Sequence, residues 1–171
     1  MNRFEELNRS HNRTGFDCGV QELNDFLHKL AHQNFKKGLS RTFVLINKEI
    51  PKEIVSFYTL SVFEVSAKKL SQKFSKKYKS HLPAVKIARL AVSQALQHQG
   101  LGKLMLVDAI RRAIAISKQA GIIGLFVDAE NEDAKRYYLK FGFIPLPDHP
   151  LTLFLPLKTL QKMYAEVFEE K

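Results

Sequence analysis

The sequence is poor in the features that mark secreted and membrane proteins. It holds one cysteine, Cys18, which excludes an internal disulfide and predicts a reducing, cytoplasmic setting. No apolar run reaches the roughly 18–20 residues that cross a bilayer. The polar start MNRFEELNRSHNR also lacks the apolar core of a signal peptide. We therefore expect no membrane association.

The chain also lacks internal repeats and linkers rich in glycine, serine or proline. Its 171 residues fit one domain with a substantial core, and a content of 45% hydrophobic and 26% charged residues is ordinary for a globular protein. The expected organisation is a single domain over residues 1–171.

Positive charge is in clear excess. The net charge of +10, with a pI near 9.7, favours a polyanionic partner, with nucleic acid ahead of anionic lipid. The stretch 66–81 holds six lysines and no acidic residue, and we expect a loop or a short helix there.

Hydrophobic periodicity predicts strands and helices in alternation. Residues 21–35 place their apolar side chains on one helical face, whereas 41–47 and 53–63 are rich in β-branched and aromatic residues, as an antiparallel strand pair would be. The other expected elements are strand 85–92, helix 103–119 ended by Gly121, strand 122–127, helix 133–140, strand 152–157 and a helix from about Lys158. Pro156 predicts that the last strand lies near a sheet edge. Strands joined through helices imply a partly parallel sheet and an α/β (α+β) fold.

The turn after strand 85–92 has the pattern Gln-x-x-Gly-x-Gly at Gln97, Gly100 and Gly102. Glycines permit unusual backbone angles and let a large anion approach the main chain. The first amides of the next helix lack intrahelical partners and can bind phosphate, and Lys103 adds a positive charge. A tight connection without a ligand would explain two spaced glycines equally well.

Two other phosphate loops are excluded. A nucleotide P-loop needs an earlier glycine and a serine or threonine after its lysine, where this chain has Leu104. A dinucleotide fingerprint needs a third glycine, where the chain has Met105.

The loop resembles the cofactor motif of the GNAT acetyltransferase superfamily, Gln/Arg-x-x-Gly-x-Gly/Ala after a central strand. Further motifs in matching order resemble one branch, the acetyltransferase toxins of bacterial toxin–antitoxin pairs. They are Phe16-Asp17-Cys18-Gly19, Tyr58-Thr59-Leu60-Ser61, Arg89-Leu90-Ala91-Val92, Val127-Asp128-Ala129, Phe141-Gly142-Phe143 and Leu153-Phe154-Leu155-Pro156. The resemblance covers residues 14–160, and 66–81 falls where the family has a variable linker.

The resemblance implies a mixed, mostly antiparallel sheet, splayed by a parallel pair at a cofactor cleft, with helices on both faces. It also implies acetyl-CoA as acetyl donor, with its pantetheine arm beside Leu90, Ala91 and Val92. The residues expected at its pyrophosphate are Gln97, Gln99, Gly100, Leu101, Gly102 and Lys103.

Tyr138 is the expected general acid, because it lies three residues before Phe141-Gly142-Phe143, where the family places that group. A phenol with a pKa of about 10 is protonated at neutral pH and can donate to a leaving thiolate. Val92 is the candidate for a backbone N–H that stabilises the thioester oxygen. Asn131 either contacts the cofactor or caps helix 133–140.

No general base is evident, which weakly favours an α-amine acceptor, whose pKa lies at or below about 8.0. His28 and His32 have a spacing that can bind a metal. No third ligand is indicated, so we expect no metal site and take both as exposed polar residues.

The toxins of this branch acetylate the α-amine of aminoacyl-tRNA and so block translation. They imply a homodimer and a small antitoxin with a ribbon-helix-helix part. The basic residues expected to meet tRNA are Arg89, Lys36, Lys37 and Arg41. Two alternatives stay open: an N-acetyltransferase of a small amine or protein, and a non-catalytic module that binds acetyl-CoA.

Overall fold

The computed structural model describes residues 1–166, which form a seven-stranded sheet in the order β1-β2-β3-β4-β5-β7-β6. The chain divides into two compact units. Unit 1 contains residues 1–61 and 88–109, and unit 2 contains residues 62–87 and the chain from 110 onward. Three elements contribute to both units: β3 (Ile50–Ser66), β4 (His81–Val92) and α4 (Leu101–Ser117).

Unit 1 begins with β1 (Asn2–Glu6), which pairs antiparallel with β2 (Arg41–Asn47); β2 in turn pairs antiparallel with β3. The predicted pair of strands is therefore confirmed. The sequence analysis did not predict β1, because four of its five residues are polar and none is fully buried. Tyr58 and Thr59 of β3 are buried, and their hydroxyls bond Asp108 and Thr42 respectively.

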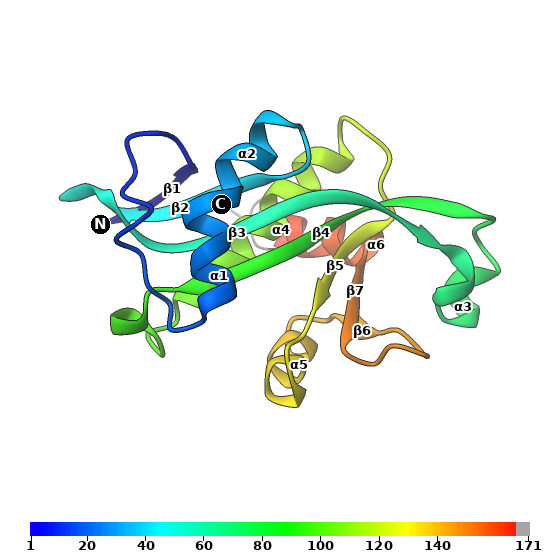
Figure 1. Cartoon of the computed structure of the whole chain (residues 1–171). Helices are drawn as coiled ribbons and strands as arrows, with labels where there is room; N and C mark the ends of the chain where they lie inside the picture. The colour runs from blue at the N-terminus through cyan, green and yellow to red at the C-terminus, as the bar shows by residue number, and fades with distance from the viewer. Residues whose placement is uncertain (167–171) are drawn as a thin grey trace. The chain divides into compact units, whose positions relative to one another are not determined.

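The helix predicted over 21–35 is present in three pieces: α1 (Gln21–Asp25), a π-helical segment (Phe26–Leu30) and α2 (Ala31–Lys36). Phe26, Leu27 and Ala31 pack in one core cluster with residues of β2 and β3. Figure 1 shows the ribbons of α1 and α2 next to these strands. Leu30 and Phe35 belong to the predicted face but are 46% and 42% exposed. The wider π turn rotates the chain relative to an α-helix, so the 3.6-residue period fails across it.

Unit 2 contains the parallel pair, β4 with β5 (Gly124–Asp128), over Val85–Leu125 to Ile87–Val127. Beyond Ile87, β4 runs on to Val92. β5 pairs antiparallel with β7 (Thr152–Pro156), and β7 with β6 (Ile144–Pro145). The mostly antiparallel sheet with one parallel pair is as predicted.

Unit 2 also contains the end of α4 and three further helices. They are α3 (Gln72–Ser75), which follows a 3₁₀ turn at Ala67–Lys69, α5 (Glu132–Leu139) and α6 (Leu157–Tyr164). The core packs Phe126 of β5 against Phe154 of β7, with stacked rings 4.6 Å apart. No helix within residues 1–166 is long and apolar enough to cross a membrane.

β7 lies near the sheet edge, as predicted, because it is next to the short edge strand β6; Pro156 ends β7 and directly precedes α6. One boundary prediction was wrong. Gly121 does not end α4, which stops at Ser117, where the hydroxyl donates to the Ile114 carbonyl at 2.6 Å. That bond takes up a carbonyl oxygen near the last helical turn.

Candidate functional site

The predicted phosphate loop leaves β4 at Val92, passes a 3₁₀ turn (Gln94–Leu96) and opens α4 at Leu101. Gly100 has φ +80°, in the left-handed region that favours glycine. A Cβ added there would meet nothing within 4 Å, so the space beside the main chain is open. Gly102 is helical, and the expectation that both glycines use unusual angles is wrong for it. The second residue of the loop with positive φ is His98, at 64°, which the sequence did not reveal.

Gln97 fastens the loop to the rest of unit 1. Its side-chain amide donates to the carbonyl of Val92 at 3.1 Å and to the carbonyl of Cys18 at 2.9 Å. The Gln94 N–H donates to the Asp17 carbonyl at 2.8 Å. An amide nitrogen has two protons and can bridge two carbonyls, which explains a glutamine at this position. Gln97 therefore shapes the loop with its side chain.

The segment Phe16–Gly19 is held by hydrogen bonds of its own. The Asp17 carboxylate accepts from the Gly19 N–H at 2.8 Å and from Asn24 at 2.9 Å, and both bonds lower the pKa of Asp17. Asn24 also accepts from the Cys18 N–H at 2.9 Å. Cys18 is buried, with Sγ 3.6 Å from the Val20 carbonyl, in keeping with a structural role. This motif thus anchors the phosphate loop.

Leu90, Ala91 and Val92, the residues expected beside the pantetheine arm, form the end of β4. Ala91 is buried in the cluster with Phe16 and Phe26, whereas Leu90 and Val92 are half-buried. Alternation along a strand places Leu90 and Val92 together on the face opposite Ala91.

Two of the four basic residues expected to meet tRNA are occupied by protein contacts. The Arg89 guanidinium lies over the Phe26 ring, 3.7 Å from its centroid, and burial lowers its pKa. Arg41 donates to Glu6 at 2.8 Å and lies 5.3 Å from the centroid of Phe35. Lys36 and Lys37 end α2 and are exposed.

Tyr138 lies on α5 with 8% of its surface exposed. Its ring packs edge-on against Phe143, with centroids 5.6 Å apart. Burial raises the pKa of Tyr138 to about 12, and the neighbouring Tyr137 and Glu130 add to the rise. The phenol therefore keeps its proton at neutral pH, as a proton donor must. Tyr137 is 37% exposed and packs on Phe141 instead.

Asn131 caps α5, because its side chain accepts from the Ala134 N–H at 2.9 Å. The carboxylate of Asp128 pairs with Lys86 and accepts from the Thr152 hydroxyl at 2.9 Å.

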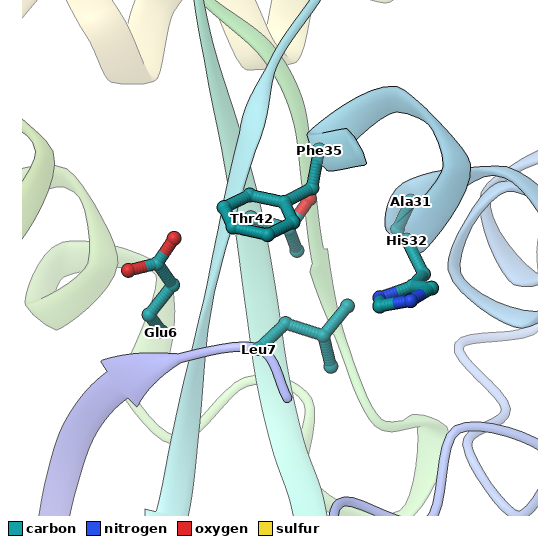
Figure 2. A pocket seen from close by; sticks show the side chains of 6 residues that line it. All are labelled: Glu6, Leu7, Ala31, His32, Phe35 and Thr42. Atoms are coloured by element: carbon teal, nitrogen blue, oxygen red, sulfur yellow. The ribbon is translucent and has the colours of Figure 1, made fainter. Parts of the chain in front are cut away.

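The expectation that His28 and His32 are exposed was wrong. Both are half-buried, and His28 donates to the Phe16 carbonyl at 2.9 Å. His32 and Phe35 line a small hollow with Leu7 and Thr42, shown in Figure 2. The hollow holds about 10 Å³, roughly the space of one water molecule, which is far too small for a cofactor. Within residues 1–166, no three His, Cys, Asp or Glu side chains are placed to hold a metal ion.

Comparison with known proteins identifies the family. Residues 4–143 match the profile of the Acetyltransferase (GNAT) family, which is most of the chain. The protein belongs to the GNAT acetyltransferase family. It is an N-acetyltransferase by family.

Its relatives extend the similarity over nearly the whole chain. A protein of Mycobacterium tuberculosis named tRNA-acetylating toxin is 30% identical, over 90% of each chain. A tyrosine-to-phenylalanine mutant of KacT is 32% identical, with a TM-score of 0.88 over 95% of this chain and 98% of KacT.

Two structures of AtaT are also similar. AtaT complexed with acetyl-methionyl-tRNAfMet is 30% identical, with a TM-score of 0.87 over 96% of this chain and 99% of AtaT. A mutant AtaT toxin bound to the C-terminus of the antitoxin AtaR and acetyl-CoA is 28% identical, with a TM-score of 0.80 over 95% of this chain and 98% of AtaT.

Proposed function

We propose that this GNAT protein transfers acetyl from acetyl-CoA to the α-amine of aminoacyl-tRNA and thereby blocks translation as a toxin. The observation that carries the proposal is the similarity to AtaT in complex with acetyl-methionyl-tRNAfMet, which extends over 96% of this chain and 99% of AtaT. Because the similarity extends along nearly the full length of both chains, it includes the parts of the enzyme that would bind the acceptor as well as the loop proposed to bind the donor.

The residues of the loop fit acetyl-CoA. The open space beside Gly100 and the start of α4 at Leu101 form a cradle for a pyrophosphate. In this proposal the backbone amides of Gln99–Lys103 hold the phosphates, and Leu90–Val92 bind the pantetheine arm. Asn131 is proposed to contact the cofactor in addition to capping α5. Acetyl-CoA supplies an acetyl group activated as a thioester.

The acceptor amine attacks as a neutral nucleophile, so a bond from nitrogen to the acetyl carbon forms while the carbon–sulfur bond breaks. The Val92 N–H is proposed to stabilise negative charge on the carbonyl oxygen. Tyr138 donates a hydrogen bond to the departing sulfur. Its pKa of about 12 exceeds the roughly 8.5 of a thiol, so Tyr138 does not stay ionised. The proton lost by the amine balances the proton gained by sulfur.

We further propose that residues 1–171 act as one GNAT domain, since the family profile draws on both compact units. The proposed assembly is a cytoplasmic homodimer neutralised by a small antitoxin with a ribbon-helix-helix part. The solved complex of AtaT with the C-terminus of AtaR supports an antitoxin of some kind.

The decisive experiment measures transfer of labelled acetyl to total aminoacylated bacterial tRNA. Tyr137→Phe is the matched control for Tyr138→Phe, because both tyrosines lie on α5 and only Tyr138 is buried. We expect label on the aminoacyl group, a loss of at least about tenfold in Tyr138→Phe, and little change in Tyr137→Phe.

Parallel reactions with a polyamine and a peptide separate the alternatives. Strong activity on these amines without label on charged tRNA would support a small-amine or protein acetyltransferase. Binding of acetyl-CoA with no turnover on any acceptor would support a binding module.

A further inference from the structure

The connection between β3 and β4, residues 66–81, carries the short helix α3 (Figure 1) and belongs to unit 2. Its apolar side chains point into the core: Leu70 is buried, and Phe74 packs edge-on against Phe154 with ring centroids 5.4 Å apart. The Ala67 N–H donates to the Ser80 carbonyl at 2.9 Å and ties the two ends of the connection together. The segment is therefore a structured element.

All six lysines of this segment are exposed. They are Lys68, Lys69, Lys73, Lys76, Lys77 and Lys79. Lys73 and Lys77 each lie 5.7 Å from the centroid of an adjacent aromatic ring, Phe74 and Tyr78. Among residues 1–166, none of the six forms an ion pair with a carboxylate, and the segment itself has no acidic residue. Within residues 1–166, the positive charge of the segment is therefore not neutralised by a carboxylate.

This arrangement contrasts with the arginines singled out from the sequence. Arg89 is stacked on Phe26 and Arg41 is paired with Glu6, so both already have partners within the protein. Uncompensated lysines repel one another. A row of phosphates relieves this repulsion, and the binding also releases counterions from the nucleic acid. Residues 66–81 therefore carry a group of exposed lysines that no carboxylate within residues 1–166 neutralises.

We propose that residues 66–81 bind the phosphate backbone of a base-paired RNA stem and so hold the body of the tRNA substrate. The inference rests on the proposed function. Proteins that bind single strands present exposed aromatic rings for base stacking. Here Phe74 and Tyr78 are half-buried against the core. Lysine ammonium groups contact phosphates and do not read the bases. This mode of binding suits a base-paired stem, whose bases are stacked inside the helix.

The test replaces four lysines whose side chains make no hydrogen bond, ion pair or ring contact within residues 1–166. The variant carries Lys68→Gln, Lys69→Gln, Lys76→Gln and Lys79→Gln. The matched control carries Lys48→Gln, Lys52→Gln, Lys158→Gln and Lys162→Gln, four lysines that are also exposed. Both variants have the same net charge. Thermal unfolding checks that both fold like the wild type.

Three quantities are measured: the Kd for tRNA as a function of salt, acetylation of aminoacyl-tRNA, and acetylation of methionine methyl ester, which has the α-amine without RNA. For the segment variant we expect the Kd at about 0.15 M salt to rise about 10- to 100-fold and the salt slope to fall by about 2–4. Acetylation of charged tRNA falls in parallel, while acetylation of the ester stays unchanged. The control stays within about twofold of wild type.

Equal losses in both variants would overturn the proposal, because total charge alone would then explain binding. Unchanged tRNA binding in the segment variant would overturn it too, as would tighter wild-type binding to duplex DNA or single-stranded RNA. If the wild type acetylates the ester but never charged tRNA, the proposed function is wrong. The Kd of the segment variant for uncharged tRNA then still tests whether residues 66–81 bind RNA.

Discussion

Replacing Gly100 by alanine tests whether its backbone angle builds the acetyl-CoA loop. A Cβ at Gly100 meets nothing within 4 Å, so the free protein suffers no clash, and only φ +80° is costly. A non-glycine residue in the left-handed region costs about 1–2 kcal/mol. If the loop keeps its shape, that cost lowers the free energy of unfolding. If the loop relaxes, acetyl-CoA binding weakens about 5- to 30-fold.

Gly102→Ala is the matched control, because Gly102 is helical and the GNAT consensus accepts alanine there. Alanine in a helix is favoured over glycine by up to about 1 kcal/mol, so we expect equal or higher stability and an unchanged Kd for acetyl-CoA. Gly100→Asn separates strain from bulk. Asparagine tolerates positive φ better than alanine although it is larger, so strain predicts a milder effect than in Gly100→Ala.

The assays are calorimetric titration with acetyl-CoA and urea unfolding of each variant. The reasoning is refuted if Gly100→Ala changes neither quantity, or if Gly102→Ala loses as much affinity as Gly100→Ala. A larger loss in Gly100→Asn than in Gly100→Ala would mean that steric bulk at the pyrophosphate matters more than the backbone angle.

Three further predictions follow from side-chain contacts. The pKa of Tyr138 is about 12 in the folded state and about 10 in the unfolded state, so the folded state keeps the proton to higher pH. The free energy of unfolding should therefore fall by roughly 2–3 kcal/mol as pH rises from 10 to 12. Urea unfolding across this range should show a smaller fall in Tyr138→Phe, and equal falls would contradict the burial argument. Asn131→Ala should lower the free energy of unfolding by about 1 kcal/mol through the lost helix cap, whereas Asn131→Asp keeps the cap. Weaker acetyl-CoA binding in both variants, measured by titration, would show that Asn131 also contacts the cofactor. Arg89→Met should lower the free energy of unfolding by about 0.5–2 kcal/mol through the lost contact with Phe26. The salt dependence of tRNA binding should stay unchanged. A reduced salt slope would instead indicate that Arg89 contacts the RNA.

The sequence by itself determined most helices and strands and the glycine-containing turn between β4 and α4. Strand pairs such as 41–47 with 53–63, and the glycine at the start of helix α4, are specified by residues that are near neighbours in the chain. Periodicity and turn chemistry are local, so they can be recognised from sequence. The same locality explains the failure across the π-helical segment at Phe26–Leu30, where one local period does not hold.

Only the tertiary structure decided which polar groups are free. Gln97 bonds the carbonyl of Cys18, a residue 79 positions away, and Arg41 bonds Glu6, 35 positions away. Tyr138 owes its raised pKa to burial beside Phe143. Apolar neighbours fix the segment 66–81 in place, and within residues 1–166 no carboxylate pairs with its lysines. Burial and long-range pairing depend on how the elements pack, and no local pattern encodes them.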